Sequence, residues 1–178
     1  TIRMNDVDLD KFFRGINVAG PLLIRIEADE LTYALHIMIR YEIEKGLINE
    51  QMKVSDLPEI WNSKMQEYLG IEPENDGEGV LQDVHWSGGS FGYFPSYALG
   101  YIYAAQFANK LQHDLSDLSQ LISDGKLSAV KEWLTEHIHR HGAMYDPRDL
   151  LKRVTGEDLD ARHLVTYLQN KYKDVYNI

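Results

Sequence analysis

Apolar residues recur three and four positions apart through most of this 178-residue chain. That spacing places them on one face of a helix, whereas a strand places every second residue on the same face. Glycine and proline interrupt the pattern at intervals and mark the ends of the helical segments. The periodicity therefore predicts a mainly α-helical protein with at most one or two short strands.

Six segments have this helical spacing: 9–16, 28–46, 55–70, 96–112, 127–142 and 159–172. The apolar run at 22–27 is strand-like and precedes the second of them. The run from Ser96 is apolar on almost every face, so we expect its helix to be surrounded by others. No internal repeat divides the chain, which predicts a single helical region over residues 1–178, with sub-lobes allowed.

Charge and composition exclude several classes of partner. The chain has 18 basic and 28 acidic residues, and this acidic balance argues against nucleic acid or an anionic membrane as the main partner. No run is long and apolar enough for a membrane span, and no cleavable leader is recognisable. The absence of cysteine excludes disulfides and thiolate chemistry. We expect a soluble, cytoplasmic protein.

The sequence HIHRH at 137–141 resembles half of a zinc site, because histidines four apart share one face of a helix. However, Ile138 stands where the H-E-x-x-H motif needs a glutamate as general base. Imidazoles near the end of a helix also suit its free carbonyls and its dipole. These considerations favour a surface or capping role for His137 and His141 over metal binding.

One stripe of the helix expected over 28–46 carries polar and aromatic side chains: Tyr33, His36, Arg40 and Glu44. Arg25 precedes this helix in an apolar run. A guanidinium against an apolar wall can bind a carboxylate through two parallel hydrogen bonds, which fits recognition of a free peptide C-terminus. The residues by themselves favour the alternative, in which Arg25 or Arg40 pairs with a nearby acid, namely Glu27, Asp29 or Glu30.

The stretch GVLQDVHWSGGSFGYFPSY at 79–97 mixes glycines with polar and aromatic residues in a way that a packed core does not need. Its glycines allow the loop to hold His85, Tyr93 and Tyr97 toward a cleft. Histidine can donate to an oxyanion or move a proton, and a tyrosine hydroxyl can donate without changing charge. In the alternative, the loop is only packed, with Asp83 bonded to His85 and Gln82 to the backbone.

Two blocks carry longer patterns: IRIEADE at Ile24–Glu30 and GVLQDVHW at Gly79–Trp86. They resemble, in the same order, the I-R-x-E-A-D-E and G-x-x-Q-D-x-H-W motifs of the thermostable metallocarboxypeptidases, the Taq-type carboxypeptidase family. The segments LPEIWNSKMQEYLGIEP and TGEDLDARHLVTYLQNKY extend the resemblance over nearly the whole chain.

This resemblance implies the helical C-terminal portion of a gluzincin-like metallopeptidase, an enzyme that removes single residues from peptide C-termini with zinc or cobalt and usually forms a homodimer. The family holds its metal with the two histidines of H-E-x-x-H and a glutamate in a following block. Neither block occurs in this sequence. We therefore expect the metal-binding part to lie upstream, no metal in this chain, and no activity of the chain alone.

The family pattern also implies roles for individual residues. Arg25 would bind the carboxylate of the substrate, and His85 and Tyr97 would steady the oxyanion as catalytic residues. Gln82 and Asp83 would hold His85, while Tyr93 is a weaker candidate for the cleft wall. His36 and Arg40 would either touch substrate or brace their helix. The alternative function is a stand-alone helical binding module that has kept the fold and lost the metal site.

Overall fold

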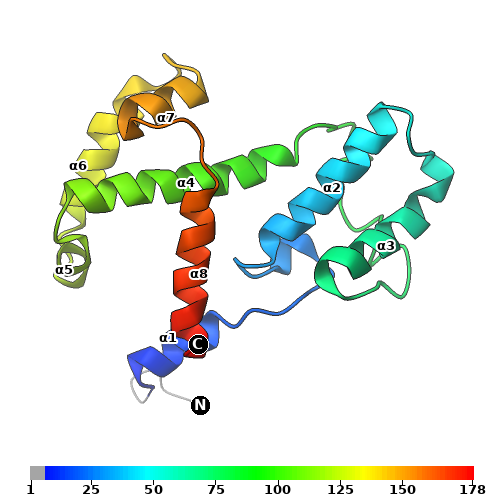
Figure 1. The fold of residues 1–178 in the computed structure, drawn as a ribbon, viewed down its shortest axis with the longest axis horizontal. Coiled ribbons are helices and arrows are strands. Elements are labelled where there is room, and N and C mark those ends of the chain that lie inside the picture. Colours follow the sequence, from blue (N-terminus) through cyan, green and yellow to red (C-terminus); the bar gives the residue numbers. More distant parts are fainter. Residues whose placement is uncertain (1–6) are drawn as a thin grey trace. The chain divides into compact units, whose positions relative to one another are not determined.

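A computed structural model describes residues 7–178 of the chain (Figure 1). The regular structure in this range consists of α-helices and short 3-10 turns, without a strand. The prediction of a mainly α-helical fold is confirmed. The strand expected at 22–27 is wrong, because the chain forms the 3-10 turn η2 (Arg25–Glu27) there.

The chain divides into two compact units. One contains the residues up to Ala98 together with Asn170–Ile178, and the other contains Leu99–Gln169. Two helices, α4 (Pro95–Asp114) and α8 (Arg162–Tyr176), run from one unit into the other. The expectation of a single region over 1–178 stays a prediction.

In the first unit, helices α2 (Tyr33–Ile48) and α3 (Leu57–Leu69) lie side by side (Figure 1). Their facing sides bury one apolar cluster: Ile39, Ile43, Trp61, Met65, Leu69 and Val80. Pro58 lies in the first turn of α3, where its missing N–H is not needed, and Gly70 ends the helix in the left-handed conformation. The sequence predicted both of these ends.

Helix α2 begins at Tyr33, five residues later than predicted. The cause is Asp29, whose Oδ1 accepts hydrogen bonds from the backbone N–H groups of Leu31 and Thr32. Its Oδ2 accepts from the Gly20 amide and the Thr32 hydroxyl. Burial alone would raise the pKa of Asp29, but these hydrogen bonds outweigh it and lower the pKa. Asp29 therefore builds the turn that delays the helix.

Helix α1 (Leu9–Ile16) belongs to the same unit and contacts the end of α8. The Asp8 side chain accepts from the Asp10 amide and caps the start of α1. Arg14 donates to the carbonyls of Asp174 and Val175, and the Tyr176 hydroxyl accepts from the Ala19 amide. These contacts satisfy free carbonyls at the end of α8.

The second unit contains α5 (Leu118–Ser123), α6 (Leu127–His137) and α7 (Pro147–Thr155). Leu111 of α4, Trp133 of α6 and Val154 of α7 share its buried cluster. Helices α5 and α7 were not predicted, because each is too short to show several apolar repeats. None of the helices within 7–178 combines the length and apolarity required to cross a membrane.

Helix α4 is less enclosed than predicted. Among its residues only Gln106 and Leu111 are buried, and most of its apolar side chains are half-buried. The Gln106 side chain donates to the Asp158 carbonyl and accepts from the Asp160 amide, so it anchors the segment before α8. The apolar composition on almost every face of α4 predicted a surrounded helix, but the described residues of this chain cover it only in part.

Gly70 offers a test of the α3 terminus. Its φ is +70°, and a Cβ added there meets no atom within 4 Å, so an alanine suffers backbone strain alone. We expect Gly70→Ala to lower the free energy of unfolding by about 1–2 kcal/mol in urea titrations followed by circular dichroism. Gly15→Ala is the control, because Gly15 has open space around it inside α1. Equal losses in both variants would contradict this explanation.

Candidate functional site

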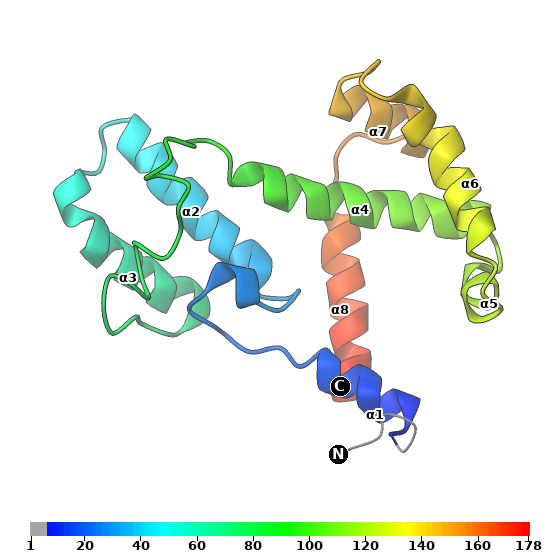
Figure 2. The same ribbon diagram turned by 180° about the vertical axis from the view of Figure 1, so that it is seen from behind.

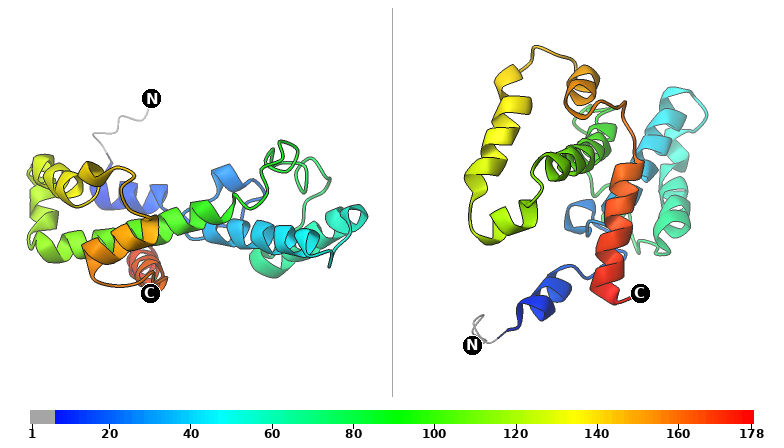
Figure 3. Two further views of the ribbon diagram at one scale, coloured as in Figure 1. Left: turned by 90° about the horizontal axis from the view of Figure 1, so that it is seen from above. Right: turned by 60° about the vertical axis from the view of Figure 1, so that its left-hand side comes forward.

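The segment between α3 and α4, residues 70–94, passes across α2 (Figure 2) and lies on one side of the α2–α3 pair (Figure 3, left). Hydrogen bonds between nearby backbone groups shape it as successive turns, among them Gly88 N to Val84 O at 3.0 Å and Ser90 N to His85 O at 2.8 Å. A turn-rich backbone lets polar side chains point toward the helix without forming a core. This segment carries Asp83 and His85.

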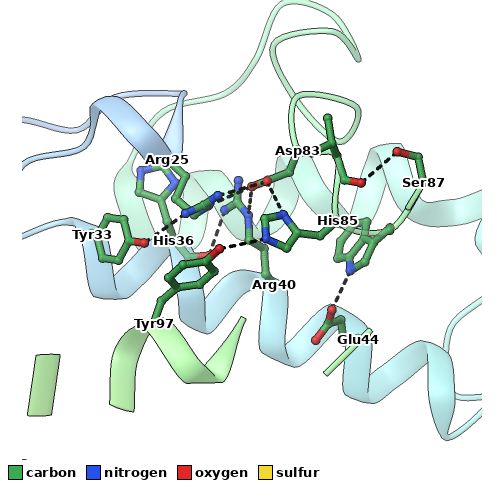
Figure 4. A network of polar contacts seen from close by, with 11 residues as sticks. Arg25, Tyr33, His36, Arg40, Glu44, Asp83, His85, Ser87 and Tyr97 are labelled. Atoms are coloured by element: carbon green, nitrogen blue, oxygen red, sulfur yellow. Dashed lines mark hydrogen bonds and ion pairs between the residues drawn. The ribbon is translucent and has the colours of Figure 1, made fainter. Parts of the chain in front are cut away.

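The Asp83 carboxylate is the centre of a polar network (Figure 4). Its Oδ2 accepts from Arg25 Nε at 3.0 Å and Arg40 Nε at 2.8 Å. Its Oδ1 accepts from Arg25 Nη2 at 3.2 Å and lies 2.9 Å from His85 Nδ1. These four contacts use the whole acceptor capacity of a carboxylate. Asp83 is therefore saturated, and its side chain is only 10% exposed.

The two arginines decide the charge of Asp83. Burial alone would raise the pKa of this carboxyl group, but the hydrogen bonds and charges of Arg25 and Arg40 outweigh it and lower the pKa to about 2. Burial lowers the pKa of Arg40 to about 10 against the opposing effect of Asp83. At neutral pH two guanidinium ions therefore face one carboxylate.

The ionised Asp83 fixes the hydrogens of His85. A carboxylate only accepts, so Nδ1 of His85 carries a hydrogen and donates it to Asp83. Nε2 lies 3.1 Å from the Tyr97 hydroxyl, and in the neutral imidazole it accepts from that group. The His85 ring packs on the fully buried ring of Phe94, with 4.4 Å between the centroids. The result is an ordered chain from Asp83 through His85 to Tyr97.

Arg25 lies in the turn η2 and is only 6% exposed. Besides Asp83, it donates from Nη1 to the Tyr33 hydroxyl at 3.0 Å, so three of its five N–H groups are accounted for. Its guanidinium lies 5.0 Å from the centre of the Tyr97 ring. Arg25 does form an ion pair, but its partner is Asp83, not Glu27, Asp29 or Glu30.

His36 and Arg40 are fully buried in α2. Arg40 donates from Nη1 to the His36 carbonyl and lies 4.7 Å from the centre of the Trp61 ring. Burial, followed by the charges of Arg40 and Arg25, lowers the pKa of His36 to about 4, and a weak contact with the Leu22 backbone opposes this. Within residues 7–178, neither His36 ring nitrogen has a hydrogen-bond partner of ordinary geometry. A neutral imidazole therefore lies behind the network.

Gln82 and Tyr93 lie at the margin of this network. The side-chain nitrogen of Gln82 is buried without a hydrogen-bond partner in the described part of the chain, so Asp83 orients His85 instead. Tyr93 is 51% exposed, and its ring stacks on His85 with centroids 5.8 Å apart. It meets Tyr97 edge-on at 5.4 Å. The packed-loop alternative is thus right about the bond between Asp83 and His85.

Comparison with known proteins shows the family of this chain. Residues 2–172 match the family model described as Carboxypeptidase Taq (M32) metallopeptidase. The chain belongs to this family. It is 54% identical over 175 residues to Carboxypeptidase 1 of Bacillus subtilis, covering 98% of the chain and 35% of that protein. Against Thermostable carboxypeptidase 1 of Thermus thermophilus, the identity is 44%, covering 97% of the chain and 34% of that protein.

Solved structures of M32 carboxypeptidases have the same fold. The enzyme from Deinococcus radiodurans superposes with a TM-score of 0.95 at 34% identity, covering 98% of this chain and 35% of that one. A carboxypeptidase of Pyrococcus furiosus gives a TM-score of 0.91 at 40% identity, covering 95% and 34%. The chain thus spans about a third of the length of the M32 relatives it matches.

An M32 metallopeptidase needs a metal, yet the described residues do not fit one. No group of three or more His, Asp and Glu side chains within 7–178 is arranged to hold a metal ion. Helix α6 ends at His137, and the 3-10 turn η4 (His139–His141) follows, so His137 and His141 do not share a helical face. Instead, His137 packs on Trp133 with centroids 4.6 Å apart, and His141 packs on Tyr145.

Two contributors to the site were given no role from the sequence. Phe94 is a fully buried ring that packs against His85. Nothing in the sequence distinguished it from the other aromatic residues nearby. Glu44 of α2 accepts from the Trp86 indole N–H at 2.8 Å and from the Gly92 amide at 3.1 Å. The signal for Glu44 was its place four residues after Arg40, on the polar stripe of an otherwise apolar helix.

Asp83 should govern stability in acid. Its folded pKa of about 2 lies below the value of about 3.9 in an unfolded chain, so its contribution is complete above pH ~4 and is lost as the pH falls toward 2. We expect this contribution to be about 2 kcal/mol. Asp83→Asn should lack this part of the pH dependence and lose about 3–5 kcal/mol at neutral pH, because two buried arginines lose their partner.

The measurement is urea unfolding from pH 2 to 7. Asp76→Asn is the control, because Asp76 is exposed on the same segment and its replacement should change stability by no more than about 0.5 kcal/mol. An unchanged difference between wild type and Asp83→Asn across pH 2–4 would show that Asp83 is not the titrating group.

Proposed function

We propose that this chain is the C-terminal, substrate-binding part of a metal-dependent carboxypeptidase that releases single amino acids from peptide C-termini. The observation that carries the proposal is the Asp83 network, which joins Arg25 of the first motif block to Asp83 and His85 of the second. Two motifs separated by helices α2 and α3 meet at one carboxylate. Membership of the M32 family supports the same conclusion.

The metal, zinc or cobalt, would be bound outside residues 7–178. Within the described part of the chain, no group of His, Asp and Glu side chains is arranged to hold it. The chain by itself would then bind peptides without hydrolysing them. Its own contribution would be to recognise the C-terminus of the substrate and to place hydrogen-bond donors near the scissile carbonyl.

Arg25 would recognise the terminal carboxylate. Asp83 binds Nε and Nη2 of the guanidinium and the Tyr33 hydroxyl binds Nη1, which leaves two of the five N–H groups for a ligand. Two arginines against one Asp83 also leave a surplus positive charge in a buried setting. A substrate carboxylate would balance that charge, and this is the physical reason for placing it here.

His85 and Tyr97 would steady the oxyanion of the tetrahedral intermediate. In the neutral network the Tyr97 hydrogen is directed at His85 Nε2, so it is not available to a substrate. Once His85 is protonated, Nε2 donates to the Tyr97 oxygen and frees the hydroxyl hydrogen for the carbonyl oxygen. Asp83 stabilises the imidazolium through Nδ1. Proton uptake by His85 and donation by Tyr97 are thus linked.

The remaining candidates would act around this centre. His36 and Arg40 would support Asp83 from the interior of α2, because both are fully buried. Tyr93 would line the approach to His85, as its exposed ring suits contact with a peptide. Gln82 would donate its unpaired side-chain N–H to the substrate or to a backbone carbonyl.

Peptides with a free C-terminus would be the partners of the whole protein, which we place in the cytoplasm as a homodimer. The half-buried apolar side chains of α4 support association with further protein. The net charge of −10 disfavours nucleic acid and anionic membranes as partners.

Tyr97→Phe tests the catalytic role. The substitution removes the hydroxyl beside His85 and keeps the ring, so we expect kcat of the intact protein to fall roughly a hundredfold to a thousandfold with little change in KM. The assay follows release of C-terminal amino acids. Tyr103→Phe, further along α4, is the matched control and should keep the wild-type kcat. An unchanged kcat in Tyr97→Phe would remove this hydroxyl from the mechanism.

Arg25→Lys tests carboxylate recognition. Lysine keeps the charge beside Asp83 but loses the two-pronged donor, so binding of a C-terminally free peptide should weaken roughly tenfold to a hundredfold. The corresponding C-terminal amide should be affected much less. The measurement is the inhibition constant of each ligand.

Arg40→Lys separates this role from support of the network, because Arg40 binds the same carboxylate from a buried position. It should weaken the acid and the amide equally. The same equal loss in Arg25→Lys would exclude Arg25 as the group that recognises the carboxylate.

A further inference from the structure

Glu44 is a buried carboxylate that forms no ion pair with a cation of residues 7–178. It is 4% exposed on the inward side of α2 (Figure 4). Within residues 7–178 it accepts from two neutral donors, the Trp86 indole and the Gly92 amide. None of the ion pairs formed within residues 7–178 includes it. Burying a charge in this way is unfavourable compared with an apolar side chain of similar size. Apolar packing alone therefore does not explain why a carboxylate occupies this position.

Along the chain, both donors lie between the two residues of the proposed catalytic pair. Trp86 directly follows His85, and Gly92 comes five residues before Tyr97. Between them, the Gly89 amide donates to the Trp86 carbonyl and the Ser90 amide donates to the His85 carbonyl. Gly92 has a φ of +74°, a conformation that suits glycine and turns its N–H toward Glu44. One side chain thus holds both ends of this turn.

Helix α2 anchors the loop at two points one helical turn apart. Arg40 holds Asp83, and Glu44 holds Trp86. His85 lies between these two anchored residues in the sequence, so the backbone on both of its sides is fixed to the same rigid helix. The Trp86 ring also contacts Phe94 edge-on, with centroids 6.2 Å apart. Phe94 in turn packs against the His85 ring, so Glu44 and Trp86 are connected to His85 through Phe94.

We propose that Glu44 is a positioning residue for His85 and Tyr97, acting through the Trp86 indole and the Gly92 amide that it binds. The proposal rests on the proposed function for the effect on catalysis, whereas its structural part concerns the His85 ring alone. Glu44 sets the height and tilt of that ring relative to the Tyr97 hydroxyl. Misplacement of a reacting group by about 1 Å can lower turnover about a hundredfold.

Glu44→Gln in the intact protein is the main variant. Glutamine has nearly the same shape but only one acceptor oxygen, so one of the two N–H groups faces an amide NH₂ instead. We expect kcat to fall about tenfold to a hundredfold with KM nearly unchanged, and the ring ¹⁵N signals of His85 to move. The indole N–H signal of Trp86 should shift in the same spectra.

Glu42→Gln is the matched control on the same helix. Glu42 accepts from the Tyr68 hydroxyl at 2.6 Å and pairs with Lys64, so it joins α2 to α3 and not to the loop. Its loss should lower the melting temperature while leaving kcat and the His85 signals as in wild type. If Glu44→Gln behaves in the same way, Glu44 is structural and the proposal is overturned.

Two further variants complete the test. If Glu44→Gln fails to fold, Trp86→Phe is the second variant: it removes the indole N–H, keeps an aromatic ring of smaller size, and should move the His85 signals and lower kcat by a smaller factor. Unchanged signals and kcat in a folded Trp86→Phe would also overturn the proposal. His85→Asn separates the two proposals. If it releases amino acids as fast as wild type while Glu44→Gln still moves the His85 signals, the proposed function is wrong, but the positioning of His85 by Glu44 is supported.

Discussion

The ion pairing of Asp83 with two buried arginines is the interaction on which the rest of the site depends. Arg25 reaches it across 58 residues and Arg40 across 43, so the carboxylate ties a turn, a helix and a loop together. A buried guanidinium without a counter-charge would be strongly unfavourable, so the pairs must form together. This requirement holds the loop against α2 where apolar packing alone would allow it to shift.

The same pairing sets the chemistry of His85. Because the arginines keep Asp83 ionised, the carboxylate holds the Nδ1 hydrogen and leaves Nε2 facing Tyr97. A protonated Asp83 would allow either tautomer, and the direction of the hydrogen bond to Tyr97 would no longer be defined. The buried charges behind the loop thus determine which atom at its surface can donate. Electrostatics in the interior and donor geometry at the site are parts of one arrangement.

Local signals in the sequence predicted helices well and side-chain partners poorly. Pro58 and Gly70 mark the two ends of α3 locally, and this helix was predicted with both ends. By contrast, the sequence favoured acids close to Arg25 as its ion-pair partners. Asp29, one of these acids, instead accepts hydrogen bonds from the backbone N–H groups of Leu31 and Thr32. The true partner, Asp83, lies beyond α2 and α3, and no periodicity connects it to Arg25. Only the family resemblance, which gives Arg25 and His85 roles on the same substrate, implied that the two blocks lie close together.

The network is complete within one unit of the chain. Arg25, Arg40, Asp83, His85 and Tyr97 all precede Leu99, the first residue of the other unit. Their mutual distances are therefore set by the packing of η2, α2, the loop and the first turn of α4. The enclosure of α4 is different, because its apolar faces are half-buried in a chain that spans about a third of its relatives. Apolar composition therefore does not fix how far α4 is covered, whereas the hydrogen bonds that saturate Asp83 are all made within this unit.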